Sequence, residues 1–268
     1  MIVMSNYPWK NAYRFPVGND LLKTVFQFHN KTVWINYQNN IRVPSAELEN
    51  WINENSGNES DYRPESWIKK IKLTSTFKPN NIGSIRDFSF KQLSLCMVSK
   101  LIIKSFGKNE NNFSRRYPSA GGLYTVIPLL YVFNSAGEIE SGIYMIDSVK
   151  FELLKIVPSI EQNVPLKDSI TISQDDSKIP SVYCIGYAIN IPASVVKYGL
   201  RGYRHALMEV GLMAQAFRES CHELNLGEYC SSSFDDFPLT YESGLNVRDS
   251  PICLIQWFGG KKDVIKSE

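Results

Sequence analysis

The sequence contains few cysteines and histidines, and they form no pattern typical of a disulfide framework or a metal centre. The five cysteines are odd in number, widely scattered and without a Cys-x-x-Cys pair. We therefore expect reduced thiols and a cytoplasmic protein. His205 and Glu209 are one helical turn apart, but two ligands without a third are typical of a salt bridge, so no metal site is expected.

Long apolar runs and a strong excess of one charge are also absent. No apolar stretch reaches the roughly 18 residues that indicate a membrane span. The first eight residues have neither the basic head nor the apolar core of a signal peptide. The net charge is +2 and no long basic run occurs. We therefore expect neither a membrane nor a nucleic acid as a partner.

What the sequence does contain is enough apolar material for a folded core. Of the 268 residues, 43% are hydrophobic, which suits one large core or two modest ones. Residues 1–80 have polar, Asn-rich loops around short helical patterns at 20–29 and 45–53, and no catalytic constellation. The sequence therefore predicts an N-terminal region, 1–80, and a main domain, 81–268.

The main domain shows both helical and strand periodicity. The apolar spacing of residues 94–105 predicts a helix capped by Ser94. A longer apolar stripe from Tyr203 predicts a helix that residues 197–204 run into and that ends near Asn225. Residues 161–180 read as a polar surface excursion, and 228–237 as a loop. Strands are expected at 123–133, 142–146, 151–156, 181–191 and 251–258, and the second and third should form a hairpin bridged by Asp147 and Ser148.

One decapeptide, residues 115–124, stands out as a candidate binding loop. It reads Arg-Arg-Tyr-Pro-Ser-Ala-Gly-Gly-Leu-Tyr. Gly121 and Gly122 allow close approach of the backbone to a ligand, and Pro118 fixes a bend. Ser119 adds a hydroxyl, and Arg116 adds a positive charge. This combination suits a phosphorylated, planar cofactor.

The decapeptide resembles the flavin loop of the nitroreductase-like azoline dehydrogenases, FMN enzymes of thiazole/oxazole-modified peptide pathways of the microcin and streptolysin S type. The resemblance implies an α+β nitroreductase-like fold, with a central, mostly antiparallel sheet flanked by helices and an N-terminal extension. It implies FMN held between the subunits of a homodimer. It further implies that residues 1–80 dock or face substrate, and that cyclodehydratase and leader-binding subunits are partners in a complex acting on a precursor peptide.

The resemblance extends to other residues expected to bind FMN. Ser84 and Arg86 match a Ser-x-Arg-x-Phe pattern on the phosphate and pyrimidine side, although Ile82 and Gly83 replace the usual arginines. Small residues after the long helix are expected to line the flavin, and a basic residue after the last strand to reach its phosphate. These positions correspond to Ser231, Ser232, Ser233 and Lys261.

Lys197 and Tyr198 match the adjacent Lys-Tyr pair that azoline dehydrogenases use at the active site. Aromatising an azoline removes a proton from one ring carbon and a hydride from the next. A partly desolvated lysine near Arg201 can accept the proton, and a tyrosine hydroxyl can relay or position it. The pair is therefore the predicted catalytic pair.

The resemblance implies FMN-dependent oxidation of azoline rings to azoles in a ribosomally made peptide such as a microcin-type bacteriocin. Two alternatives stay open. One is a general NAD(P)H-dependent nitro or quinone reductase of the same fold, which has no need of the Lys-Tyr pair. The other is a flavin-free scaffold subunit of a peptide-modifying complex, which the replaced arginines favour.

Overall fold

The computed structural model describes residues 18–33, 45–55, 66–72, 83–111, 113–135, 138–170 and 179–262. The chain divides into two compact units. One lies within residues 36–83, and the other combines residues 1–35 with 84–268. This division differs from the predicted boundary at residue 80, because the first helix belongs to the main unit.

The smaller unit contains one helix, α2 (Ala46–Asn55), in its described part. This helix confirms the prediction at 45–53. Residues 66–72 form neither helix nor strand. Large apolar side chains in this unit are well exposed, namely Trp51, Trp67, Ile68 and Ile71.

A six-stranded sheet forms the centre of the main unit, in the order β3-β2-β1-β4-β6-β5. All five neighbouring pairs are antiparallel, as predicted. Asp147 closes the predicted β2–β3 hairpin, since its carboxylate accepts bonds from the Val149 and Lys150 amides. The strands are β1 (Val126–Val132), β2 (Gly142–Asp147), β3 (Glu152–Val157), β4 (Tyr183–Ile189), β5 (Leu226–Ser231) and β6 (Ile252–Gly260).

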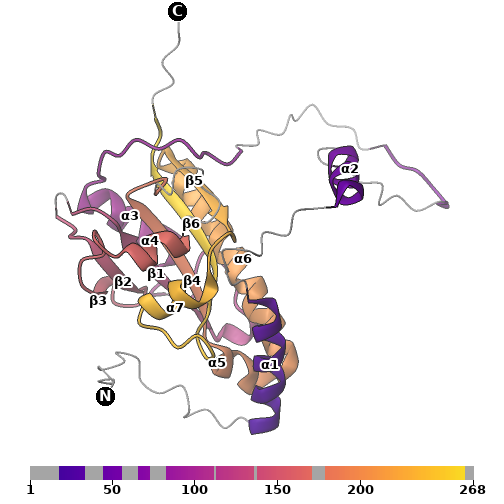
Figure 1. Ribbon diagram of the computed structural model, residues 1–268. Coiled ribbons are helices and arrows are strands. Elements are labelled where there is room, and N and C mark those ends of the chain that lie inside the picture. Colours follow the sequence, from indigo (N-terminus) through magenta and orange to yellow (C-terminus); the bar gives the residue numbers. More distant parts are fainter. Residues whose placement is uncertain are drawn as a thin grey trace, which may run out of the picture. The chain divides into compact units, whose positions relative to one another are not determined.

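Helices cover both faces of this sheet (Figure 1). In the described residues, the helices of the main unit are α1 (Asn19–Thr32), α3 (Leu95–Phe106), α4 (Val164–Ile170), α5 (Ile191–Tyr198), α6 (Leu200–Glu223) and α7 (Asp236–Glu242). None of the described helices is long and apolar enough to cross a membrane.

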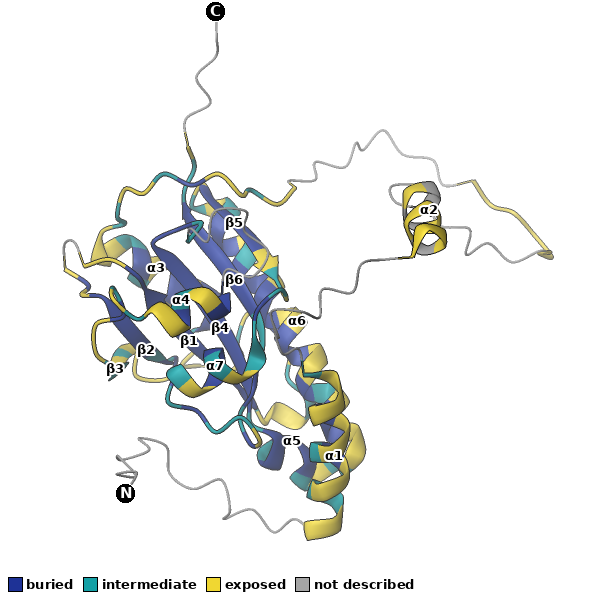
Figure 2. Cartoon of the chain, viewed as in Figure 1, coloured by how far each residue is buried: buried dark blue, intermediate teal, exposed yellow. Residues whose placement is uncertain are grey.

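Alternate strand residues supply the two sides of the core. Leu130 and Val132 of β1 pack with α3 and α6, whereas Leu129 and Tyr131 pack with α4 and α7. Figure 2 shows the central strands as buried and the outer helix surfaces as exposed, whereas the edge strand β3 has no buried residue. This two-sided burial follows from the period-two alternation of side chains in a strand.

Helix α1 joins the main unit through its contacts with α5 and α6. His29 is only 4% exposed, and its Nδ1 lies 2.9 Å from the Tyr203 hydroxyl of α6 in a hydrogen bond. The ring of Phe28 also packs edge-on against Tyr203. His29 is therefore a packing residue that holds α1 against α6.

The structure corrects three predictions of local structure. Lys197 and Tyr198 do not lead directly into the long helix but end a separate helix, α5, because Gly199 has a positive φ of 58°. The predicted polar excursion at 161–180 contains α4, although 171–178 lie outside the described residues. The predicted loop at 228–237 is instead strand β5 up to Ser231, followed by a short loop and α7.

The crossing of α5 and α6 is tight at Gly202. A Cβ on this residue would overlap the carbonyl oxygen of Ser194, whereas a Cβ on Gly211 of the same helix would meet nothing. Gly202→Ala is expected to lower the free energy of unfolding by about 1–3 kcal/mol through overpacking. Gly211→Ala, the matched control, should raise it by about 0.5–1 kcal/mol. Urea denaturation of both variants measures the difference, and equal effects would contradict the described helix crossing.

Candidate functional site

The 115–124 loop is held in a defined conformation. The Ser119 hydroxyl oxygen accepts a hydrogen bond from the Tyr124 amide at 2.8 Å. Gly121 and Gly122 have φ angles of 63° and 67°, and Tyr124 has a φ of 48°. Such angles are uncommon for a residue with a Cβ, so the surroundings must stabilise Tyr124. The Arg115 guanidinium lies over its ring at 4.1 Å.

The loop lies directly against the predicted catalytic pair. A Cβ on Gly121 would be 2.5 Å from the Tyr198 hydroxyl and 2.8 Å from Lys197 Nζ. Both side chains belong to the last turn of α5. Residues predicted to bind cofactor and residues predicted to move a proton are therefore neighbours, although more than 70 positions separate them in the sequence.

Lys197 and Tyr198 differ in their surroundings. Tyr198 is half-buried, and its ring packs edge-on against His205 with a centroid distance of 4.9 Å. Lys197 is exposed, with Nζ 5.3 Å from the centre of the Tyr198 ring. The partial burial expected of a general-base lysine is thus not provided by the described residues of this single chain.

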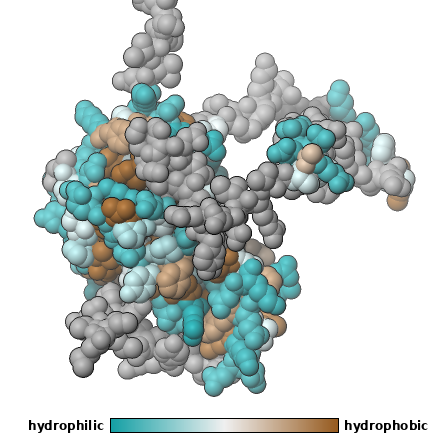
Figure 3. Space-filling model, viewed as in Figure 1, coloured by the Kyte–Doolittle hydropathy of each residue, from teal (hydrophilic) through white to brown (hydrophobic). Residues whose placement is uncertain are grey.

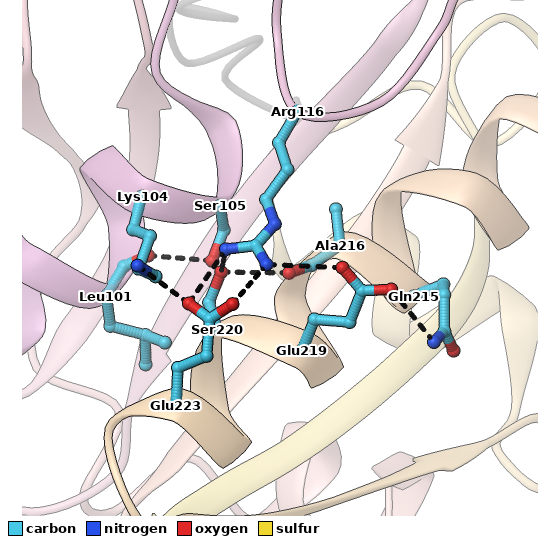
Figure 4. Close-up of polar contacts among 9 residues, drawn as sticks. All are labelled: Leu101, Lys104, Ser105, Arg116, Gln215, Ala216, Glu219, Ser220 and Glu223. Atoms are coloured by element: carbon cyan, nitrogen blue, oxygen red, sulfur yellow. Dashed lines mark hydrogen bonds and ion pairs between the residues drawn. The ribbon is translucent and has the colours of Figure 1, made fainter. Parts of the chain in front are cut away.

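Arg116 does not point at the glycines but binds the far end of α6 (Figure 4). Its guanidinium donates to Glu223 at 2.6 Å and to Glu219 at 3.2 Å, and it also reaches the Ser220 hydroxyl. Lys104 of α3 forms a second ion pair with Glu223. The hydrogen bonds from Arg116 and Lys104 lower the pKa of Glu223 to about 2. This cluster anchors the start of the loop to α3 and α6.

A second group of predicted residues lies beside the edge strand β5. The Ile85 amide donates to the Glu228 carbonyl at 3.0 Å, which places Ser84 and Arg86 next to this strand. The Arg86 guanidinium lies 5.2 Å from the centre of the Tyr229 ring. Among the described residues no carboxylate pairs with Arg86, so its neighbour Asp87 does not neutralise its charge in an ion pair.

Lys261 and the serines lie at opposite ends of β5. Leu226 pairs with Gly260 and Ser231 pairs with Ile255, so Lys261 follows one end and Ser231 and Ser232 the other. Five residues of strand correspond to about 17 Å. Lys261 Nζ donates to the Asn225 side chain at 2.8 Å. The group therefore suits an extended ligand with a negative end.

In this second group, hydroxyl and cationic donors are available to a ligand. The side chains of Ser84, Arg86 and Ser232 are exposed. In the described structure none of them forms a hydrogen bond or an ion pair with another side chain. Hydroxyl and cationic donors of this kind suit a ribityl chain and a phosphate. Ile82 lies outside the described residues, and Gly83, which replaces an arginine, contributes no charge. Within the part of the chain that the structure describes, no group of three metal-ligating side chains occurs.

Sequence reasoning missed Glu209 as a site residue. Glu209 is 3% exposed, and Ser119 Oγ donates to its carboxylate at 2.5 Å. The predicted salt bridge with His205 is not observed in the described structure. Only the spacing of the two residues on one helix face could have drawn attention to Glu209, because Ser119 is remote in sequence.

No family model matches the chain. The microcin B17-processing protein McbC of Escherichia coli is 26% identical over 227 residues, which span 82% of this chain and 81% of McbC. A chain of the E. coli microcin synthetase McbBCD complex, solved with truncated pro-MccB17 bound, matches with a TM-score of 0.79 and 23% identity. That match covers 94% of this chain and 97% of the other.

A candidate nitroreductase of Ralstonia eutropha matches with a TM-score of 0.56 and 20% identity, over 68% of this chain and 80% of the other. The predicted α+β nitroreductase-like fold is thus confirmed, as is the resemblance to microcin-type processing proteins.

Proposed function

We propose that this chain, which has the nitroreductase-like fold and is similar to McbC, is an FMN-dependent oxidoreductase that converts azoline rings of a ribosomally made peptide to azoles. Two similarities support the proposal, one to a protein described as processing microcin B17 and one to a synthetase chain solved with its peptide. The contact of Gly121 with Lys197 and Tyr198 is the structural observation that favours this reaction most.

The contact matters because azole formation requires two transfers at one place. Bound FMN would accept the hydride from one ring carbon. Lys197 would take the proton from the neighbouring carbon, and the Tyr198 hydroxyl would orient or relay it. Ser84, Arg86, Ser231, Ser232 and Lys261 would hold the phosphate and the polar chain of FMN. From the loop, Pro118, Ser119, Gly121 and Gly122 would approach the ring through the backbone.

Arg116 is best placed outside this set. Its guanidinium is occupied by Glu219 and Glu223, so its part in flavin binding is to hold the loop.

A homodimer would complete this site. Lys197 and Arg86 are exposed in the single chain, whereas a hydride transfer site must exclude water. Exposed apolar side chains lie on α6, the helix that follows Lys197, among them Leu200, Met208 and Leu212. Figure 3 shows apolar side chains among hydrophilic ones on the face in view. A second copy that covered the exposed side of α6 would bury apolar surface and desolvate Lys197.

The wider assembly would contain a cyclodehydratase and a leader-binding subunit, as the likeness to the microcin synthetase complex suggests. The predicted docking or substrate-facing role of residues 1–80 remains a proposal. The exposed Trp67, Ile68 and Ile71 support it, since they lie within the one short segment 66–72 and grouped, exposed apolar side chains mark interaction surfaces.

A general nitro or quinone reductase is the second candidate, favoured by the likeness to the Ralstonia protein. Such a reaction needs no base for a carbon-bound proton, so the Lys197–Tyr198 pair would have no catalytic role in it. A flavin-free scaffold is a third. Purified protein with a flavin spectrum would exclude the scaffold, and oxidation of an azoline peptide would exclude a reductase without this activity.

Arg86→Ala tests the cofactor part of the proposal. Loss of a charge-assisted hydrogen bond should weaken FMN binding about 10- to 100-fold. Lys91→Ala removes an exposed charge from the same segment and should leave the affinity unchanged. Quenching of FMN fluorescence on titration into apoprotein gives both dissociation constants. Equal affinity in the Arg86 variant and the parent would remove Arg86 from the site.

A further inference from the structure

The carboxylate of Glu209 is buried beneath the 115–124 loop. Glu209 lies in the first half of α6 and is 3% exposed. Ser119 Oγ donates to its Oε2 at 2.5 Å. Burial raises the pKa of Glu209, while the Ser119 bond, the backbone of Val126 and Thr125, and the Arg115 charge lower it. A buried acidic group with such specific partners requires a reason, because burial of a carboxylate is unfavourable.

Ser119 transmits this contact to the rest of the loop. Its hydroxyl donates to Glu209 and accepts from the Tyr124 amide, and its carbonyl accepts from the Gly122 amide at 3.1 Å. Both ends of the glycine turn are thus bonded to one residue, Ser119, through its hydroxyl and its backbone carbonyl. Tyr124 has a positive φ of 48°, which is unfavourable for a tyrosine. The Ser119 bond is one of the contacts that stabilise this conformation.

The same helix face also contacts the catalytic pair. His205 is one turn before Glu209 on α6, and its ring packs edge-on against Tyr198 at 4.9 Å. Tyr198 in turn lies against Gly121. Residues four apart on a helix project from the same face. His205 and Glu209 therefore support the two sides of the Gly121 contact, Tyr198 and Ser119 respectively.

We propose that Glu209 is a positioning residue, whose hydrogen bond to Ser119 preforms the glycine turn against Lys197 and Tyr198 before the cofactor binds. The proposal rests on the proposed function only in naming FMN as the ligand of the turn. Glu209 itself touches neither cofactor nor substrate. The Ser119 bond is the contact through which Glu209 reaches the glycine turn, so removal of either partner should release the turn.

Hydrogen exchange tests the loop without any ligand. In the apoprotein, Glu209→Leu and Ser119→Ala should each raise the exchange rate of the Tyr124 amide about 10-fold or more, because its acceptor is lost or released. Glu209→Gln keeps an acceptor for the Ser119 hydroxyl and should exchange at nearly the parent rate. Exchange of the β1 amides is the internal control for global stability.

A double-mutant cycle with FMN supplies the second readout. Glu209→Leu, Ser119→Ala and the double variant should all weaken FMN binding by a similar factor, about 10-fold. Independent effects would instead multiply, to about 100-fold in the double variant, and would overturn the proposal. Unchanged exchange at Tyr124 in Ser119→Ala would also overturn it, even if Glu209→Leu does not fold. Failure of the parent protein to bind FMN would contradict the proposed function, while the exchange experiment would still decide the role of Glu209.

Discussion

Gly121→Val is expected to abolish FMN loading while most of the fold remains intact. The glycine has a φ of 63°, which a β-branched residue adopts only with strain. A Cβ would also lie 2.5 Å from the Tyr198 hydroxyl and 2.8 Å from Lys197 Nζ. The turn must therefore move away from α5, and the backbone approach that the flavin requires is lost.

Gly244→Val is the matched control for this variant. Gly244 has a similar φ of 71°, but a Cβ there would meet nothing within 4 Å. Both variants carry the backbone strain, and only Gly121→Val carries the clash at the site. The ratio of flavin to protein absorbance, measured beside circular dichroism, distinguishes them. Full flavin content in a folded Gly121→Val protein would mean that the loop merely turns the chain.

Lys197→Ala and Tyr198→Phe are expected to retain FMN and to lose azole formation. Removal of a general base slows a reaction by about 10²–10⁴-fold. Tyr198→Phe removes only a hydroxyl and leaves the ring contact with His205, so it is the cleaner of the two changes. Single-turnover oxidation of an azoline peptide, followed by mass, measures the rate for each variant.

Lys100→Ala serves as the control for the loss of an exposed lysine, since Lys100 lies on α3 and is exposed. It should oxidise the peptide at the parent rate. Parent rates in both Lys197→Ala and Tyr198→Phe would show that the proton is transferred elsewhere. Loss of FMN together with activity would mean that the pair is structural.

Much of the fold could be predicted because it depends on local patterns. The cap at Ser94, where the hydroxyl accepts from the Met97 amide at 3.2 Å, and the β2–β3 turn at Asp147 both follow from a few neighbouring residues. The break between α5 and α6 was missed because the apolar stripe of the long helix starts at Tyr203, and residues 197–202 were read as leading into it. Gly199, with its positive φ, was the available signal, since glycine commonly ends a helix in this way.

Helix α4 and strand β5 depend on tertiary packing instead. Leu166 and Ile170 are buried against the sheet, yet they stand among polar residues that read as a surface loop. Strand β5 was read as a loop because Glu228 interrupts its apolar pattern. Glu228 is fully buried, where Gln256 donates to it at 2.7 Å and Arg218 forms an ion pair.

The candidate site shows the same division. The sequence motifs predicted the 115–124 loop and the Lys197–Tyr198 pair. Only the structure shows that the loop and the pair are in contact. Arg116 pairs with Glu223, which is 107 residues away in the sequence, and Ser119 pairs with Glu209, which is 90 residues away. No local pattern indicates such pairs, because each depends on how α6 crosses the start of β1.

The most direct test of the proposed function is the mass of an azoline-bearing peptide before and after incubation with the FMN-loaded protein and its partner subunits. Oxidation of each ring removes two hydrogen atoms, so the account predicts that the peptide mass falls by two hydrogens per ring converted. When Tyr198→Phe replaces the parent protein, the peptide mass should stay the same. An unchanged peptide mass, with a fully loaded flavin and an intact complex, would contradict the account.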